Sequence, residues 1–211
     1  MLSLFLLLVF VGVTAGLWFQ GTWNNALALI NLTLATLVAT NYYEPICGLI
    51  EGFDKSFTYL LDFVVIWILF ALFYGIFRAV TDTLSGSRVK FVMPAEMALR
   101  SVLAIWCGWL MTCFVAFTMQ FAPLNAENPL GGWENEEGVA LFVGPERLWW
   151  NFMQNRSMNA LSRGKFSAKP PHPQAQADGR NVEAFDPTDT FFLKYHTRRK
   201  KYSETESMRV N

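Results

Sequence analysis

The sequence predicts an all-α membrane protein, with four transmembrane helices in a small bundle, then an amphipathic helix and a disordered polar tail. Of its 211 residues, 53% are hydrophobic and 16% are charged, against roughly 25% charged in a typical soluble domain. The charge is uneven: residues 1–123 hold 5 basic and 6 acidic side chains, and residues 124–211 hold 12 and 11. The first charged residue is Glu44. An apolar half therefore precedes a polar one.

The uncharged N-terminal stretch of 43 residues is too long for one membrane crossing. About 20 helical residues cross a hydrocarbon core about 30 Å thick, whereas this stretch would extend roughly 65 Å as one helix. Turn-forming residues at 20–25 (QGTWNN) divide it. We therefore predict helices over 2–19 and 26–41. A cleaved signal peptide is the alternative for the first, but no basic residue precedes its apolar stretch, which favours a retained helix.

Two further apolar stretches predict helices over 57–77 and 101–121. Arg78 follows the first, and Pro123 lies just beyond the second. The transmembrane domain is thus predicted to cover residues 1–123. A soluble protein with buried helices is the alternative, but shorter apolar stretches are expected there.

Basic residues in the short loops predict the orientation. The segment 78–100 holds Arg78, Arg88, Lys90 and Arg100, whereas residues 41–56 hold a single lysine. Because short cytoplasmic loops are enriched in Lys and Arg, we expect loop 78–100 in the cytoplasm and both termini outside. The basic run at 198–201 argues for the reverse, but it lies far beyond the 15–20 residues that count.

Small residues recur every four positions in each predicted helix. Such stripes let helix backbones approach each other in lipid, where the hydrophobic effect contributes little to association. They predict a compact bundle or a homo-oligomer. The candidates for helix packing are Gly12 and Gly16, Ala35 and Ala39, Ala71 and Gly75, and Ala104, Gly108, Thr112 and Ala116.

Motifs that carry chemistry are missing from the sequence. The three cysteines lack CxxC spacing, and the two histidines lie 24 positions apart in the polar tail. The sequence has no HExxH, phosphate-binding loop or GxSxG motif. We therefore predict neither an enzyme nor a bound cofactor or metal. The net charge of zero argues against nucleic acid as a partner.

Two polar residues fall inside predicted spans. Asp62 lies near the start of the third helix, and an acid within a span is a functional hypothesis by default because charge is costly there. The structural alternative places it at the membrane interface, where it favours the helix dipole. Asn31 is expected to bond a neighbouring helix.

The remaining chain divides into two parts. Residues 124–165 form an extramembrane segment, with an amphipathic helix predicted over 146–162 that either lies in the membrane interface or docks on the bundle. Residues 166–211 are rich in Pro, Ala, Gln and charge, a composition that buries little apolar area. We predict a largely disordered polar tail there.

Short motifs between residues 16 and 123 occur in a characteristic order. They are 16–21 (GLWFQG) at the first turn, 26–29 (ALAL) and 39–43 (ATNYY) in helix two, 52–54 (GFD) before the helix over 63–77, and Glu96, Arg100, Ala104 and Gly108 in helix four. This stretch resembles the colicin V production protein (CvpA) family of bacterial inner-membrane proteins. The family's fourth helix opens with an Asp-Arg pair and glycines at helical spacing, followed by Arg-Gly. At those places this sequence has Glu96-Met97 and Cys107-Gly108. No role of the family's two arginines therefore carries over.

The resemblance implies a four-helix protein of the bacterial inner membrane, linked to toxin production or export or to envelope maintenance, with no catalytic residues. The leading functional hypothesis is a non-catalytic scaffold or assembly factor, whose partners are the lipid bilayer, further copies of itself or other envelope membrane proteins. The alternative is a channel or transporter subunit for a small solute. It requires Asp62, Asn31 and the threonines of helix two to face one polar path.

Overall fold

A computed structural model describes residues 2–51, 58–85, 93–120, 122, 144–157, 185–186 and 190–207. They form six helices: α1 (Leu2–Trp18), α2 (Thr22–Glu51), α3 (Thr58–Leu84), α4 (Met93–Met119), α5 (Pro145–Ser157) and α7 (Phe191–Ser207). No strand occurs in these residues, so the all-α class is confirmed for this part of the chain.

Three of the helices are long and apolar enough to cross a membrane. They are α2 over residues 22–50, α3 over 60–84 and α4 over 93–119. Helix α1 is apolar but has 17 residues, which at 1.5 Å per residue is about 25 Å. That is shorter than the hydrocarbon core of about 30 Å, so a fourth span stays a prediction.

The first two helices lie close to their predicted positions, but the turn between them is shorter than expected. It covers residues 19–21, and Gly21 adopts a φ of +84° that favours glycine. Helix α2 already begins at Thr22, where the side-chain hydroxyl donates to the Glu96 carbonyl at 3.0 Å. It also continues ten residues beyond the predicted end at 41, through Pro45.

The next two helices also differ from their predicted boundaries. Helix α3 passes Arg78 and ends at Leu84, because the Arg78 guanidinium pairs with Asp82 one turn later at 3.0 Å and does not stop the helix. Helix α4 begins at Met93, eight residues before the predicted start at 101, and ends at Met119, two residues before the predicted end at 121.

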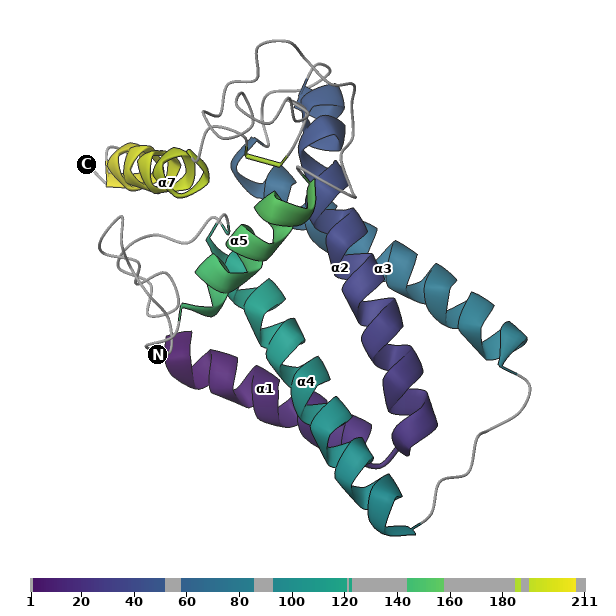
Figure 1. Ribbon diagram of the computed structural model, residues 1–211. Coiled ribbons are helices and arrows are strands. Elements are labelled where there is room, and N and C mark those ends of the chain that lie inside the picture. Colours follow the sequence, from purple (N-terminus) through teal and green to yellow (C-terminus); the bar gives the residue numbers. More distant parts are fainter. Residues whose placement is uncertain are drawn as a thin grey trace.

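The four long helices run antiparallel in chain order (Figure 1). At the end that holds the α1–α2 turn, the Trp23 indole donates to the Ser85 hydroxyl at 2.7 Å, and the Arg100 guanidinium lies over the Trp18 ring. At the opposite end, Leu2 packs with Ala116 of α4. Helix α2 packs on both α3 and α4, whereas α1 packs on α4 and α3 lies at the periphery.

Helices α5 and α7 lie at the end of the bundle opposite the α1–α2 turn (Figure 1). We name the segments 145–157, 185–186 and 191–207 the cap. The prediction of a largely disordered tail over 166–211 was wrong for α7, whose Phe191 ring stacks on Phe117 of α4 at 4.8 Å. The predicted amphipathic helix is present as α5, and its expected extension over 158–162 lies outside the described residues.

Candidate functional site

The small residues of α4 pack inside the bundle as predicted. Ala104, Gly108, Thr112 and Ala116 are all buried. Gly108 marks the closest approach, because a Cβ added there would collide with the Thr14 hydroxyl and lie 3.1 Å from the Phe10 carbonyl oxygen of α1. Ala35 and Ala39 of α2 are also fully buried. These two stripes form helix contacts within the chain.

The other two stripes do not pack within the chain. Gly12 and Gly16 of α1 are exposed, and so are Ala71 and Gly75 of α3. A Cβ added at any of the three glycines would meet nothing within 4 Å. The sequence allowed either a compact bundle or a homo-oligomer, and these two stripes form no close helix contact within the described residues. α1 presents a different face to α4, and α3 packs mainly on α2.

The polar side chains in the middle of α2 bond to protein neighbours. The Asn31 amide donates to the Thr81 hydroxyl of α3 at 2.8 Å, as predicted for a polar residue facing another helix. Thr33 and Thr36 donate to carbonyls one turn back in their own helix, at 2.7 and 2.8 Å. Thr40 does the same at 2.8 Å and accepts a bond from Trp149 of α5 at 3.1 Å.

Asp62 joins the transmembrane region to the cap. Its side chain is buried, and one carboxylate oxygen accepts hydrogen bonds from the Tyr195 hydroxyl at 2.7 Å and from Arg198 Nη1 at 2.5 Å. Both donors lie on α7. The carboxylate is thus compensated by a hydroxyl and a guanidinium from the C-terminal part of the chain.

Burial shifts the pKa values of two side chains of α7. Desolvation, followed by the nearby Asp62 carboxylate, raises the pKa of Tyr195 well above its usual value, so the phenol stays protonated and donates. Burial lowers the pKa of Arg199 to about 10. Its Nη2 donates to Gln120 at 3.4 Å, while Nη1 is buried without a hydrogen-bond partner in the described part of the chain.

Asp186 organises the cap. One of its carboxylate oxygens accepts from the backbone N–H of Thr190 at 2.9 Å, and the other accepts from the backbone N–H of Phe191 at 3.1 Å. These bonds satisfy donors at the start of α7, as capping residues do. The second oxygen also accepts from the Trp150 indole of α5 at 2.9 Å. Asp186 therefore ties α5 to α7.

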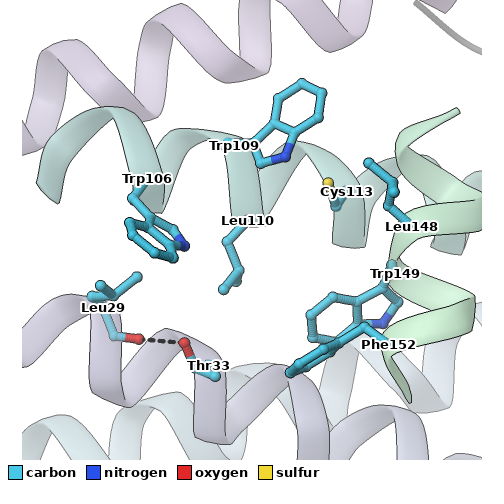
Figure 2. Close-up of a pocket in the computed structure, with 9 residues that line it drawn as sticks. All are labelled: Leu29, Thr33, Trp106, Trp109, Leu110, Cys113, Leu148, Trp149 and Phe152. Carbon is cyan, nitrogen blue, oxygen red and sulfur yellow. Dashed lines mark hydrogen bonds between the residues drawn. The ribbon is translucent and has the colours of Figure 1, made fainter. Parts of the chain in front are cut away.

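Helix α5 docks on the bundle, one of the two arrangements expected for it. Trp149 and Met153 are buried against α2 and α4, and the Trp149 indole bonds to Thr40. Leu148 and Phe152 on the same helix remain about two-fifths exposed. These two line an apolar groove between α2, α4 and α5 (Figure 2).

The sequence interpretation missed the residues that hold the cap in place. Tyr195, Arg198 and Asp186 lie in segments that were expected to be solvated. The available signal was the spacing of Phe191 and Tyr195, which are four positions apart and so share one helix face. That signal was outweighed by the polar composition around it.

The described residues show no arrangement typical of catalysis or of metal binding. The three cysteines, Cys47, Cys107 and Cys113, are buried and unbonded to each other, and no cluster of three metal-ligating side chains occurs within the described ranges. Comparisons of the chain with protein-family models, curated proteins and solved structures gave no match.

Proposed function

We propose that this chain is a non-catalytic integral membrane scaffold or assembly factor of the bacterial inner membrane, supporting toxin production or export, or envelope maintenance. The resemblance of residues 16–123 to the colicin V production family supplies the process. The three membrane-length helices and the docked cap support an integral membrane scaffold.

One observation favours this proposal over the channel alternative. The polar side chains of the apolar helices form hydrogen bonds to different neighbouring helices. Asn31 bonds toward α3, Thr40 toward α5 and Asp62 toward α7. A solute path requires such groups to face one lumen, where they replace the solute's hydration. The bonding of these three residues favours a structural role for each.

The exposed small residues of α1 and α3 support a role in assembly. Ala71 with Gly75 leaves a narrow exposed face on α3, and Gly12 with Gly16 lines a hollow between α1, α2 and α3. In lipid, small residues let the backbone of a second helix approach closely. We propose that these faces bind a further copy of the chain or another envelope membrane protein.

Site-specific photo-crosslinking in native membranes tests the assembly role. A photoreactive residue at Ile76, which is exposed beside Gly75, is expected to give a discrete adduct. Gly75→Leu should abolish the adduct without changing the abundance of the chain. Val102→Phe, at an exposed position on α4, is the matched control and should leave the adduct unchanged. An adduct that resists Gly75→Leu contradicts assembly through this face.

Proton flux into vesicles loaded with a pH-sensitive dye tests the alternative. Vesicles containing the purified protein are expected to leak protons no faster than empty vesicles. A flux that Asp62→Ala abolishes, with protein incorporation intact, would replace the scaffold proposal with a channel or transporter.

A further inference from the structure

The proposed scaffold role does not use the groove between α2, α4 and α5. Its volume is about 420 Å³, within the range of roughly 300–1,000 Å³ of ligand sites. Figure 2 shows its side chains converging from the three helices. They are Leu29, Thr33, Trp106, Trp109, Leu110, Cys113, Leu148, Trp149 and Phe152.

The wall of the groove suits an apolar occupant. Aromatic and aliphatic side chains dominate it. The Thr33 hydroxyl donates to the Leu29 carbonyl at 2.7 Å, and the Trp149 indole donates to Thr40 at 3.1 Å. Both of these polar groups are therefore engaged with the protein itself, so a hydrocarbon chain loses no hydrogen bond by filling the space.

The groove runs from the cap helix α5 to the middle of the membrane-length helix α4. On α4 it extends from Trp106 to Cys113, a rise of about 10 Å at 1.5 Å per residue. Trp106 is more than half exposed at its edge. The groove is therefore open to the surroundings of the helices, which for spans of this kind are lipid acyl chains.

A basic side chain, Arg156, lies at the cap end of the groove. The Arg156 guanidinium lies 5.8 Å from the centre of the Phe152 ring, and Phe152 is part of the groove wall. Arg156 is exposed and forms no ion pair within the ranges that the structure describes. The acid nearest in sequence on this helix is Glu146, which is fully buried ten positions before Arg156 and lies near Cys113. An apolar slot that ends in an accessible guanidinium complements a hydrocarbon chain that ends in a phosphate.

From this juxtaposition we infer that the groove binds one acyl chain of an anionic phospholipid, with the lipid phosphate at Arg156. The chain fills the slot between Trp106 and Phe152, and the headgroup lies beside α5. The inference is independent of the scaffold proposal, because it concerns a bound lipid and not an assembly partner.

Lipid titration followed by native mass spectrometry tests the inference on the purified, delipidated full chain. The probes are phosphatidylglycerol, phosphatidylcholine and inorganic phosphate. We expect one phosphatidylglycerol to be retained per chain, with phosphatidylcholine bound about five-fold more weakly and inorganic phosphate not retained, since one basic side chain near anionic lipid is worth about that factor.

Two groove-filling variants and one headgroup variant locate the site. Thr33→Phe and Leu110→Trp each place extra volume in the slot and should lower lipid retention about tenfold. Arg156→Gln should remove the preference for phosphatidylglycerol while leaving phosphatidylcholine binding unchanged. Ile68→Trp adds the same bulk at an exposed position on α3, and Arg147→Gln removes a cation that lies over Phe192 instead. Both should behave as wild type.

The outcomes are distinguishable. Each variant must first elute as a monodisperse species. If one of the two groove variants does not, the other still tests the acyl site. Equal lipid retention by wild type and a folded groove variant overturns the acyl site. Unchanged headgroup preference in Arg156→Gln overturns the phosphate contact. Retention of inorganic phosphate by the wild type, in the absence of lipid, also overturns the inference.

Discussion

At the scale of single residues, the glycines differ in function although the sequence presents them alike. Gly108 lies against Thr14 and Phe10 of α1, whereas Gly12 and Gly75 have open space where a side chain would stand. The four-residue spacing identifies a narrow face on each helix but not the direction in which that face points. The direction depends on how the whole bundle packs, which a local pattern does not contain.

Gly108→Ala is expected to destabilise the protein by about 1–3 kcal/mol, because a methyl group there forces α1 away from α4. Thermal unfolding in detergent provides the measurement. Gly12→Ala and Gly75→Ala are the controls, and both should unfold within about 0.5 kcal/mol of wild type, as surface substitutions do. Equal effects at Gly108 and Gly75 would contradict the close contact between α1 and α4.

Asp62→Asn is expected to weaken the attachment of α7 by about 1–3 kcal/mol, because it replaces the charge-assisted hydrogen bond between the buried carboxylate and the partly exposed Arg198 guanidinium with a weaker one. Protease resistance of α7 in the folded protein reports the loss. Combining Asp62→Asn with Arg198→Gln should recover part of it. The exposed pair Arg78–Asp82 is the matched control, and Asp82→Asn should cost less than about 1 kcal/mol. Identical losses at both sites would show that the Asp62 pair contributes no more than a surface pair.

At the scale of elements, local composition predicts the apolar helices, whereas the cap depends on tertiary contacts. The helices α2, α3 and α4 were predictable because each contains a largely apolar stretch. Helix α7 was not, because its amphipathic face has two aromatic residues, Phe191 and Tyr195, among many charges. A helix of this kind is stabilised by the surface on which it docks and not by its own propensity.

Arg199→Met is expected to strengthen the docking of α7 by about 1–3 kcal/mol at neutral pH, because a buried, partly unsatisfied guanidinium is replaced by a side chain that loses nothing on desolvation. Since burial lowers the pKa of Arg199 to about 10, its charge is present and costly throughout the pH range below 10. That cost diminishes as the pH rises from about 10 toward the value of the unfolded chain, where stability should increase.

Hydrogen exchange of the α7 backbone amides measures this effect. Lys201→Met, at an exposed position on the same helix, is the control and should not slow the exchange. Faster exchange in Arg199→Met would mean that the bond from Arg199 to Gln120 outweighs the desolvation of the charge.

At the scale of the whole molecule, folding changes which charges lie near the membrane. The basic run at 198–201 is remote from the spans along the sequence, yet Arg198 contacts the first turns of α3. The predicted orientation, with loop 78–100 in the cytoplasm and both termini outside, counted distance along the chain. The structure places basic residues at both ends of the bundle, which no sequence window reveals.

Labelling of single cysteines with a membrane-impermeant maleimide checks the predicted orientation. In a chain without its native cysteines, Leu193→Cys on α7 is expected to react in intact spheroplasts. Leu84→Cys at the end of α3 should react only after the membrane is permeabilised. Both positions are exposed in the fold. The opposite pattern would reverse the orientation.

An N-terminal reporter in the same experiment checks whether α1 crosses the membrane. Because α1 runs antiparallel to α4 along its length, we expect the reporter on the side of Leu193. A reporter on the side of Leu84 would reduce the chain to three spans, with α1 lying against them without crossing.

The link between Asp62 and Arg198 has a consequence for biogenesis. The two residues are 136 positions apart, and ribosomes add about 5–20 residues per second. An acid destined for the membrane edge therefore waits on the order of ten seconds before its counter-charge has even been synthesised. During that interval the Asp62 carboxylate has no counter-charge from α7, so the contact between α3 and α7 forms only after residue 198 has been synthesised.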